Sequence, residues 1–370
     1  MLKWPEYGKE AFRSVCEQVG EGENPCSKLE RRDLEWVVPS SSNVETQTFY
    51  FDNQTTGHYG FVQVIHSNPV GLHYTAQFTC LVRHDTKPEE SVWTSTHLEG
   101  HSTRGTDFVA EGLSVTLDKD ATKYTISSVV NEDSLVELTV DRGACAGFKV
   151  GTDGTSYYGD DPAHPWGSMR HVFWPRAAAS GKLVVKGQEI KLEPDATRAM
   201  YVMAMQGMKP HHAAARWNFL NFQGPTLSCV VMEFTTPPSY GSQTVSIGAT
   251  THNDTLVGAA TDVSVQHKDA EEDDVGWPRP KAIAFDLRGP TVDDKGETRA
   301  HVEGQLEHLV DRVDVMAEIP SFVKSLVAGV SGARPYIYQF ANTLTMTLTL
   351  PDGTEVSEKG HAFSEATFIS

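Results

Sequence analysis

Short segments in which apolar and polar residues alternate constrain this chain more than any other feature of its sequence. The segment YTAQFTCLV (74–82) places Tyr74, Ala76, Phe78, Cys80 and Val82 on one face, with mostly polar residues on the other. A period of two indicates a half-buried β-strand. The same interpretation applies to residues 48–51, 60–66, 113–117, 124–130, 135–140, 170–174, 182–185 and 199–205. Turn signals at 152–154, 180–181 and 186–187 separate these segments.

The second half of the chain repeats this pattern. Strands are predicted at 227–234, 244–249, 255–259, 262–267, 281–287, 299–308, 313–318, 335–340 and 343–350, and Pro351-Asp352-Gly353 predicts a hairpin. Many antiparallel strands with short turns are typical of sandwiches and barrels. We therefore predict an all-β fold of two tandem barrels, with an N-terminal segment at 1–34, a first barrel at 35–222 and a second at 223–370.

Two segments have a helical pattern instead. Residues 320–330 begin with a proline and carry one apolar stripe, which predicts a helix in the C-terminal half. Near the N-terminus, Phe12, Val15, Cys16 and Val19 form a second stripe, so the first segment is predicted to be partly helical. That segment is expected either to contact a membrane through Met1, Leu2, Trp4 and Phe12, or to pack on the first barrel.

Composition excludes several classes of function. The net charge of −18 would repel phosphate backbones, so no nucleic-acid partner is expected. The acidic run at 269–274 is interpreted as a solvated surface. Five cysteines without a CxxC pair, and no signal peptide, favour a reducing cytoplasmic setting. No apolar run approaches the roughly 20 residues of a spanning helix.

The motifs for metal, nucleotide or nucleophile chemistry are missing. His211 and His212 would point to opposite faces of a strand, and Asp160, Asp161 and His164 fit a proline-rich loop, so we expect no metal and no cofactor. There is no GxSxG, HExxH, P-loop or dinucleotide fingerprint. Glu233, on an otherwise apolar strand, is either a buried acid or a residue paired with an arginine.

Large apolar side chains are concentrated between residues 171 and 241. The stretches HVFWPRA, MYVMAMQGMKPHHAAARWNF and VVMEFTTPPSYG carry them. Methionine-rich apolar surfaces suit adaptable pockets, but strand cores contain the same residue types. The residues alone leave a lipid cavity and a plain core as equal alternatives.

Several segments resemble the fungal survival factor 1 family, over nearly the whole chain from about residue 34. They are HVFWPRA (171–177), GMKPHHAAARWNF (207–219), MEFTTPPSYG (232–241), RPYIYQF (334–340), NVETQTFYF (43–51), GFVQVIHSN (60–68) and TAQFTC (75–80). The resemblance implies lipocalin-like barrels, survival under oxidative stress, and transport of ceramide from the endoplasmic reticulum to the Golgi. It brings no catalytic residues. Members of this family usually begin with an amphipathic helix, whereas here Met1-Leu2-Lys3-Trp4 is followed at once by Pro5-Glu6-Tyr7-Gly8, which shortens that stretch.

We therefore expect a non-enzymatic protein that binds a ceramide-like lipid. A barrel can hide acyl chains while a few polar groups hold the amide and hydroxyls. The residues expected to line the ligand are Phe173, Trp174, Tyr201, Met203, His211, Trp217, Phe234 and Tyr338. The expected location is cytoplasmic, with the nucleus and the Golgi and endoplasmic reticulum surfaces as further sites.

Two alternatives remain open. Double-lipocalin scaffolds also resemble fungal pericyclases and bacterial carotenoid hydratases, and an enzyme of that type would need an acid or base such as Glu233 or His171 inside a barrel. A protein-interaction module would have both barrels packed solid.

Overall fold

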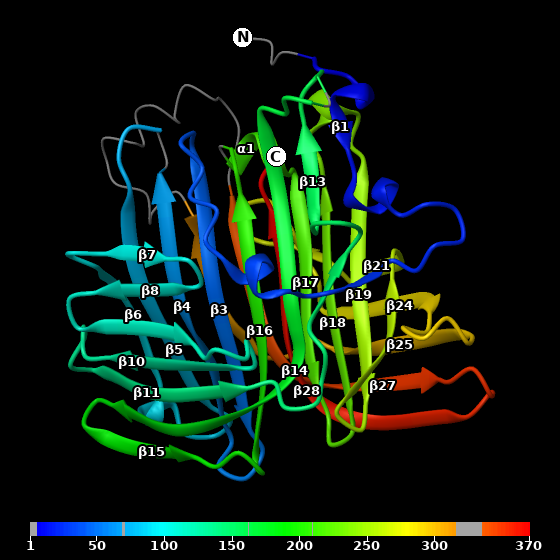
Figure 1. Cartoon of the computed structure of the whole chain (residues 1–370). Coiled ribbons are helices and arrows are strands. Elements are labelled where there is room, and N and C mark those ends of the chain that lie inside the picture. The colour runs from blue at the N-terminus through cyan, green and yellow to red at the C-terminus, as the bar shows by residue number, and fades with distance from the viewer. Residues whose placement is uncertain (1–5, 69–70, 162, 209, 316–334) are drawn as a thin grey trace. The chain divides into compact units, whose positions relative to one another are not determined.

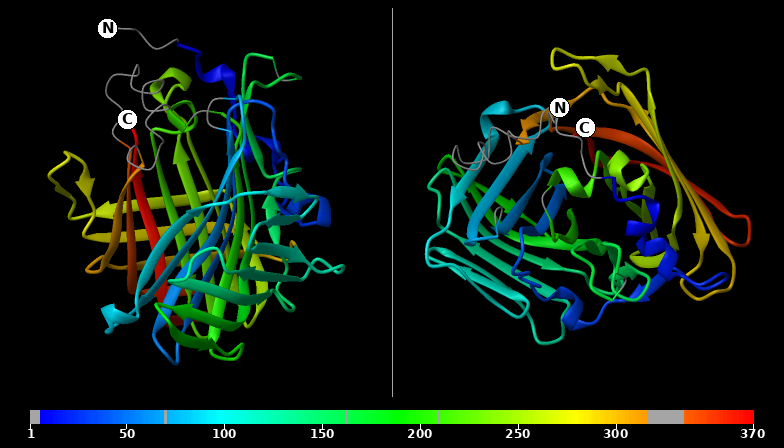
Figure 2. Two further views of the ribbon diagram at one scale, coloured as in Figure 1. Left: turned by 90° about the vertical axis from the view of Figure 1, so that its left-hand side faces the viewer. Right: turned by 90° about the horizontal axis from the view of Figure 1, so that it is seen from above.

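The computed structural model (Figure 1) describes residues 6–68, 71–161, 163–208, 210–315 and 335–370. Its contacts divide the chain into two compact units. We call Lys28–Lys149 with Arg170–Gly207 the N-terminal barrel, and Met1–Ser27 with Val150–Met169 and Met208–Ser370 the C-terminal barrel. The strands of each unit lie mainly in one curled antiparallel sheet, and the view from above in Figure 2 shows the curl. The all-β fold of two barrels is confirmed.

The sheet of the N-terminal barrel has the order β6-β5-β4-β3-β16-β14-β11-β10-β9-β8-β7, and β12 and β15 pair with β14. The 3-10 turns η3 (Arg31–Leu34) and η4 (Pro88–Glu90) flank it. The strands are β3 (Asn43–Asn53), β4 (His58–Asn68), β5 (Thr75–His84), β6 (Val92–His97), β7 (Ser102–Arg104), β8 (Asp107–Ala110), β9 (Leu113–Leu117), β10 (Lys123–Ser128), β11 (Ser134–Asp141), β12 (Phe148–Val150), β14 (Gly167–Val185), β15 (Gln188–Leu192) and β16 (Thr197–Gln206).

The alternation seen in the sequence explains the core of this barrel. On β5, Ala76, Phe78, Cys80 and Val82 are all buried in one apolar cluster, as their period of two predicts. Burying a side chain as large as Phe78 stabilises the fold by about 1.5–3 kcal/mol. The inward face of β5 therefore contributes to the apolar core of the barrel.

Strand β14 is longer than predicted. Residues 170–174 and 182–185 were expected to be separate strands with a turn at Ser180-Gly181, but they belong to one strand of 19 residues. Gly181 has a φ of 131°, and a Cβ at this position would lie 2.0 Å from the carbonyl oxygen of Glu137 on β11. The glycine therefore permits close contact within the sheet and does not end the strand.

The sheet of the C-terminal barrel has the order β20-β19-β18-β17-β28-β27-β25-β24-β21, and β26 pairs with β27. A bridge between Gly258 and Thr291 and a hydrogen bond from Val292 N to Val257 O (3.1 Å) bring β20 against the end of β24. The strands are β17 (Arg216–Gln223), β18 (Leu227–Thr235), β19 (Thr244–His252), β20 (Thr255–Ala260), β21 (Asp262–Lys268), β22 (Glu271–Glu272), β23 (Pro278–Arg279), β24 (Ala282–Pro290), β25 (Glu297–Gln305), β26 (Leu309–Asp314), β27 (Tyr336–Thr349) and β28 (Glu355–Phe368).

The predicted hairpin at 351–353 joins β27 to β28, and Leu350 N donates to Thr354 O at 2.8 Å. Gly353 has a φ of 84°, which the turn requires. The segments 335–340 and 343–350, predicted as two strands, form the single strand β27.

Residues 6–27 of the N-terminal segment pack within the C-terminal barrel, whereas its last residues pack on the first barrel, where Leu34 is buried in the core. The first elements of the segment are η1 (Lys9–Ala11), β1 (Phe12–Arg13), η2 (Val15–Gln18) and β2 (Cys26–Lys28), and β1 pairs with β13 (Thr155–Tyr158). The Phe12 ring is buried 4.8 Å from Tyr158 and 6.3 Å from Phe234. The predicted helical stripe is therefore wrong: strand pairing and 3-10 turns bury these side chains.

Helices are short in the described part of the chain. The α-helix α1 (Pro210–Ala213) is one turn, so His211 and His212 lie on a helix and not on the predicted strand; η5 (Pro238–Tyr240) is a 3-10 turn. The predicted helix at 320–330 lies outside the described residues. No helix among the described residues is long and apolar enough to cross a membrane. The predicted boundaries near residues 34 and 222 stay predictions.

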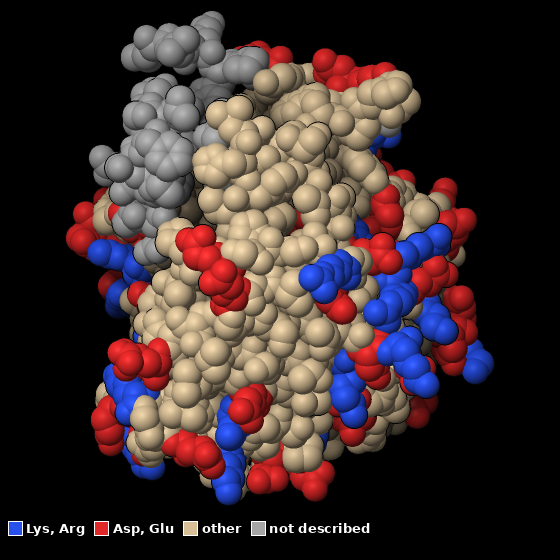
Figure 3. Space-filling model, turned by 60° about the vertical axis from the view of Figure 1, so that its left-hand side comes forward, with Lys and Arg blue, Asp and Glu red and all other residues tan. Residues whose placement is uncertain are grey.

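Charge is unevenly distributed over the surface. Figure 3 shows a broad area on which charged side chains are sparse, although the net charge is −18. Outward positions of the N-terminal barrel such as Thr116, Thr125 and Ser127 are exposed and uncharged. In the acidic run, Glu271 and Glu272 are exposed as predicted. The surface therefore combines neutral, hydroxyl-rich faces with local acidic segments.

Candidate ligand site

The interior face of the N-terminal barrel changes from apolar to polar along β3. Phe51 and Phe49 belong to the apolar core, and the same alternation then places Gln47, Glu45 and Asn43 inside the barrel. All three polar residues are almost fully buried. Buried polar groups normally have hydrogen-bond partners, so the partners of these three side chains decide what this end of the barrel can do.

Strand β4 continues the same change. Val64 lies in the core, and His66 and Asn68 follow on the same face of the strand. Register pairs Glu45 with His66, and Asn43 with Asn68. We call Asn43, Glu45, Gln47, His66 and Asn68 the polar band. It joins two neighbouring strands at one end of the barrel.

Aromatic rings surround His66. Its ring stacks on Tyr74 at 4.9 Å and lies 5.9 Å from Trp36 and 5.5 Å from His101, and the ring of Trp36 lies 5.4 Å from Phe108. We call Trp36, His66, Tyr74, His101 and Phe108 the ring cluster. Burial lowers the pKa of His66 to about 4, with His101 contributing, so the imidazole is neutral near pH 7.

The polar band and the ring cluster contain buried polar atoms without a hydrogen-bond partner among the described residues. They are Trp36 Nε1, Asn43 Oδ1, Gln47 Oε1, His66 Nδ1, Asn68 Oδ1 and His101 Nδ1. An unsatisfied buried group costs about 1–3 kcal/mol. Their concentration at one end of the barrel marks this end as a site where a polar ligand group would be stabilised.

Neighbouring polar groups are paired. Glu45 accepts hydrogen bonds from the backbone N–H groups of Val37 and Val38, each at 2.7 Å. Burial raises the pKa of Glu45, while these bonds and the charge of Arg170 oppose that rise. The carboxyl group is thus held by the backbone of the loop that precedes β3.

Three of the predicted lining residues lie inside the N-terminal barrel. Trp174, Tyr201 and Met203 are buried in its core, and the Trp174 ring lies 5.1 Å from Tyr201. The Tyr201 hydroxyl is 3.2 Å from that of Tyr124, which accepts from Gln47 Nε2 at 3.4 Å. The predicted residues therefore reach the polar band through a tyrosine pair.

Phe173 alternates with Trp174 along β14 and does not share its core. Its ring stacks on Phe148 of β12 at 5.2 Å, and the ring of His171 lies 6.2 Å away. Burial lowers the pKa of His171 to about 4, with Arg170 contributing. The candidate base His171 thus lies on the opposite face of the strand from the barrel core.

The remaining predicted residues belong to the C-terminal barrel. Trp217 and Phe234 pair across β17 and β18, while Tyr338 lies in the barrel core and its hydroxyl donates to Asp273 Oδ2 at 2.5 Å. Asp273 is thus engaged, unlike the solvated residue predicted for this run. His211 lies on α1, and its side chain is outside the described part of the structure.

Only one of the residues predicted to contact a membrane lies in the described part of the chain. Met1, Leu2 and Trp4 lie outside the described residues. Phe12 is buried on the C-terminal barrel, so its ring is not presented to a membrane.

The interior of the C-terminal barrel holds a polar relay. His267 Nε2 is 2.7 Å from Asn218 Oδ1, Asn218 Nδ2 donates to Glu233 at 3.0 Å, and Ser246 Oγ donates to Glu233 at 2.8 Å. Burial lowers the pKa of His267 to about 4, with Arg216 contributing. Glu233 is therefore half-buried and bonded to Asn218 and Ser246, where an arginine partner or full burial was predicted.

A shallow cleft of about 380 Å³ crosses the outside of the C-terminal barrel. Charged and polar residues line most of it, among them Asp262, Asp286, Arg288, Arg299 and His301. Such a lining does not suit acyl chains.

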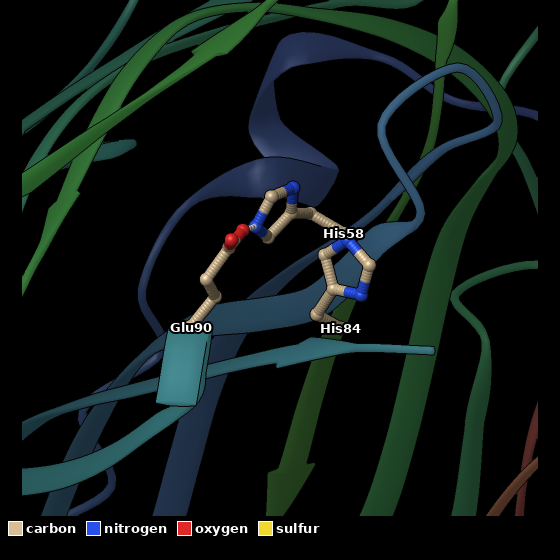
Figure 4. A group of neighbouring side chains, drawn as sticks. All are labelled: His58, His84 and Glu90. Carbon is tan, nitrogen blue, oxygen red and sulfur yellow. Dashed lines mark ion pairs between the residues drawn. The ribbon is translucent and has the colours of Figure 1, made fainter. Parts of the chain in front are cut away.

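His58, Glu90 and His84 form the one group with metal-ligand geometry that we find among the described residues, at the other end of β4. Figure 4 shows the His58 ring directed at Glu90, with Nε2 3.0 Å from Oε2. His84 Nδ1 accepts from the backbone N–H groups of Thr86 (3.0 Å) and Lys87 (3.2 Å), so neutral His84 carries its proton on Nε2. A metal bound to His84 Nε2 would move the ring proton to Nδ1, where it would face those two N–H donors. The contact between His58 and Glu90 accounts for the group without a metal.

The polar band was not predicted from the sequence, although the alternation of the two strands contains it. In NVETQTFYF the period of two that buries Phe49 and Phe51 also buries Asn43, Glu45 and Gln47, and in GFVQVIHSN it buries His66 and Asn68. Polar residues on the core face of a strand were therefore visible. The ring cluster could not be predicted in this way, because Trp36 and His101 lie in loops and follow no strand alternation.

A family model and full-length relatives place this chain in the same family. The family model described as the Svf1 family matches residues 2–370. The "Ceramide-binding protein SVF1" of Debaryomyces hansenii is 47% identical over 384 residues, covering 100% of both chains. The "Ceramide-binding protein svf-1" of Neurospora crassa is 46% identical over 377 residues, covering 100% of this chain and 96% of that protein.

Solved structures share the fold at low identity. CghA with Sch210972 has a TM-score of 0.63 at 13% identity, covering 97% of this chain and 98% of that one. Kievitone hydratase from Nectria haematococca has a TM-score of 0.56 at 14% identity, covering 96% and 97%. A putative AttH from Nitrosomonas europaea has a TM-score of 0.60 at 14% identity, covering 93% and 98%. These likenesses concern the fold alone.

Proposed function

This chain belongs to the Svf1 family, and we propose that it binds ceramide-type sphingolipids without catalysis and carries them between the endoplasmic reticulum and the Golgi. Its relatives are named ceramide-binding proteins at 41–47% identity, which supports the ligand class. Support of survival under oxidative stress and a cytoplasmic location with contact at those membranes belong to the same proposal.

One structural observation supports lipid binding most directly. The N-terminal barrel joins an apolar interior of Phe49, Phe51 and Phe78 to an end with unpaired polar atoms. A sphingolipid has the same division, with acyl chains next to an amide and hydroxyls. Each methylene left in water costs about 0.8 kcal/mol, so such a lipid needs a carrier to move between membranes.

Lipid transfer between vesicles tests this proposal. A fluorescent ceramide in donor vesicles should reach acceptor vesicles faster when the full chain is added, and native mass spectrometry should detect a one-to-one complex. Sphingomyelin, whose head is a charged phosphocholine group, is the control lipid. Equal transfer with and without protein, together with empty protein in the mass spectrum, would refute the proposal.

The polar relay supports a second candidate, an enzyme acting on a hydrophobic substrate. Glu233, held by Asn218 and Ser246 next to a neutral His267, could accept or return a proton inside the C-terminal barrel. Turnover of a polyene or quinone-type substrate that is lost in Glu233→Gln would favour this candidate. Ceramide transfer unchanged in Glu233→Gln would favour the carrier.

A further inference from the structure

We propose that the polar band and the ring cluster form a head-group site for an uncharged lipid head that donates hydrogen bonds, and that this site rejects phosphate-bearing heads. The inference rests on the proposed lipid-binding function. It adds which barrel and which end hold the head, and which chemical class is selected.

The unpaired atoms are mainly acceptors. Asn43 Nδ2 donates to the carbonyl oxygens of Pro39 (2.6 Å) and Ser41 (2.7 Å), and Gln47 Nε2 donates to that of Thr106 (3.2 Å). Carbonyl oxygens accept only, so neither amide can be reversed without losing these bonds. The orientations of Asn43 and Gln47 are therefore fixed, and their oxygens have no partner among the residues that the structure describes.

A ligand that satisfies these oxygens must bring O–H or N–H groups. Asn68 Oδ1 adds a third unpaired carbonyl oxygen, next to Asn43 in the register of β3 and β4. Trp36 Nε1 is the one fixed donor among the six atoms, and it suits a single carbonyl or hydroxyl oxygen. Two hydroxyls and an amide, as in a ceramide head, provide both kinds of group.

The charges around the band oppose an anion. Glu45 lies inside it, opposite His66 in the register, and its carboxyl is held by two backbone N–H groups. The neighbouring cation Arg170 donates to the backbone oxygen of Asp33 at 2.6 Å and lies 3.8 Å from its carboxylate. A phosphate would therefore face acceptor oxygens and an acidic group in a buried setting, which is costly.

The ring cluster provides the contact between head and chains. Trp36 and Phe108 present apolar ring surface within the same group of side chains as the unpaired nitrogens of His66 and His101. A lipid whose polar groups end in an alkyl chain meets both surfaces at once. A small polar molecule without a chain would use only half of them.

Binding by three lipids tests the proposal: a short-chain ceramide, the matching ceramide 1-phosphate and the matching diacylglycerol. The wild-type chain should bind ceramide at least tenfold more tightly than ceramide 1-phosphate, with diacylglycerol between them because it lacks the amide N–H. The double variant Gln47→Met/Asn68→Leu should lose at least tenfold in ceramide affinity. Its melting temperature should fall, because the bonds from Gln47 Nε2 to the Thr106 carbonyl and the Tyr124 hydroxyl are lost together with the two unsatisfied acceptors. The single variant Asn68→Leu, which keeps those bonds, is therefore measured beside it and should also bind ceramide more weakly.

Gln339→Met in the C-terminal barrel is the matched control and should bind ceramide like the wild type, because its Oε1 is also a buried acceptor without a partner among the described residues and its Nε2 also donates a hydrogen bond, to Glu365 at 2.8 Å. Unchanged ceramide affinity in the double variant would overturn the proposal. Equal wild-type affinity for ceramide 1-phosphate would overturn the selectivity. No binding of any lipid by the wild type would instead refute the proposed function.

Discussion

Acid should destabilise this protein through histidines that are buried in the neutral form, and His171 provides the sharpest case. It is almost fully buried on β14, where burial lowers its pKa from 6.5 to about 4. The unfolded chain therefore binds the proton more readily than the folded chain between these values. Stability is unaffected above pH 6.5 and falls as the pH drops toward 4.

The size of the effect follows from the two pKa values. For one histidine, the free energy of unfolding falls by about 2 kcal/mol at pH 5 and about 3 kcal/mol at pH 4, relative to pH 7. This is a large part of the stability of a typical domain. Buried His66 has the same lowered pKa of about 4 and adds to the trend.

Urea denaturation at pH 7, 6, 5 and 4 measures this loss. The variant His171→Gln keeps a polar side chain but cannot take up the proton, so its loss between pH 7 and pH 4 should be smaller than that of the wild type by about 3 kcal/mol. His97→Gln, at an exposed position, is the control and should follow the wild type. Parallel curves for wild type and His171→Gln would refute the reasoning.

Three further predictions concern stability, each measured by urea unfolding. Gly181→Ala should cost more than about 2 kcal/mol because of its φ and the Glu137 carbonyl, whereas Gly187→Ala, with open space around it, should cost less; equal costs would contradict this. Lys149→Met should cost about 3–5 kcal/mol because Nζ lies 2.7 Å from buried Asp33, and Asp33→Asn/Lys149→Met should recover part of that loss; no recovery would remove the ion pair as the cause. Phe12→Ala should cost about 3 kcal/mol and speed hydrogen exchange in residues 6–27, and unchanged exchange there would show that Phe12 does not hold the segment.

Local alternation and turn residues predicted most strands. Pairing between strands that are distant in the sequence decided where some of those strands end. The period of two in residues 74–82 and the turn at Asp352-Gly353 depend only on neighbours, and both predictions are confirmed. Residues 180–181 have the composition of a turn, but pairing of β14 with β11 on both sides of Gly181 keeps the strand continuous. Pairing thus outweighed local turn preference.

The candidate site could be predicted only in part. Most aromatic residues between 171 and 241 are buried, yet the predicted lining residues Trp174 and Phe234 belong to different barrels. The helical stripe from Phe12 failed because its partner, Tyr158, is more than a hundred residues away and no local signal reports it. Polar residues at the core-facing positions of a strand, as in 43–47, are the sequence signal that indicates the polar band.

The first residues of this chain are synthesised long before the residues that bury them. Phe12 packs beside Phe234, and Cys16 Sγ donates to the Ser246 carbonyl at 3.6 Å. At about 5–20 residues per second, these partners emerge on the order of tens of seconds later. During that interval the first residues are open to chaperones, membranes and modifying enzymes, and completion of the chain ends that access.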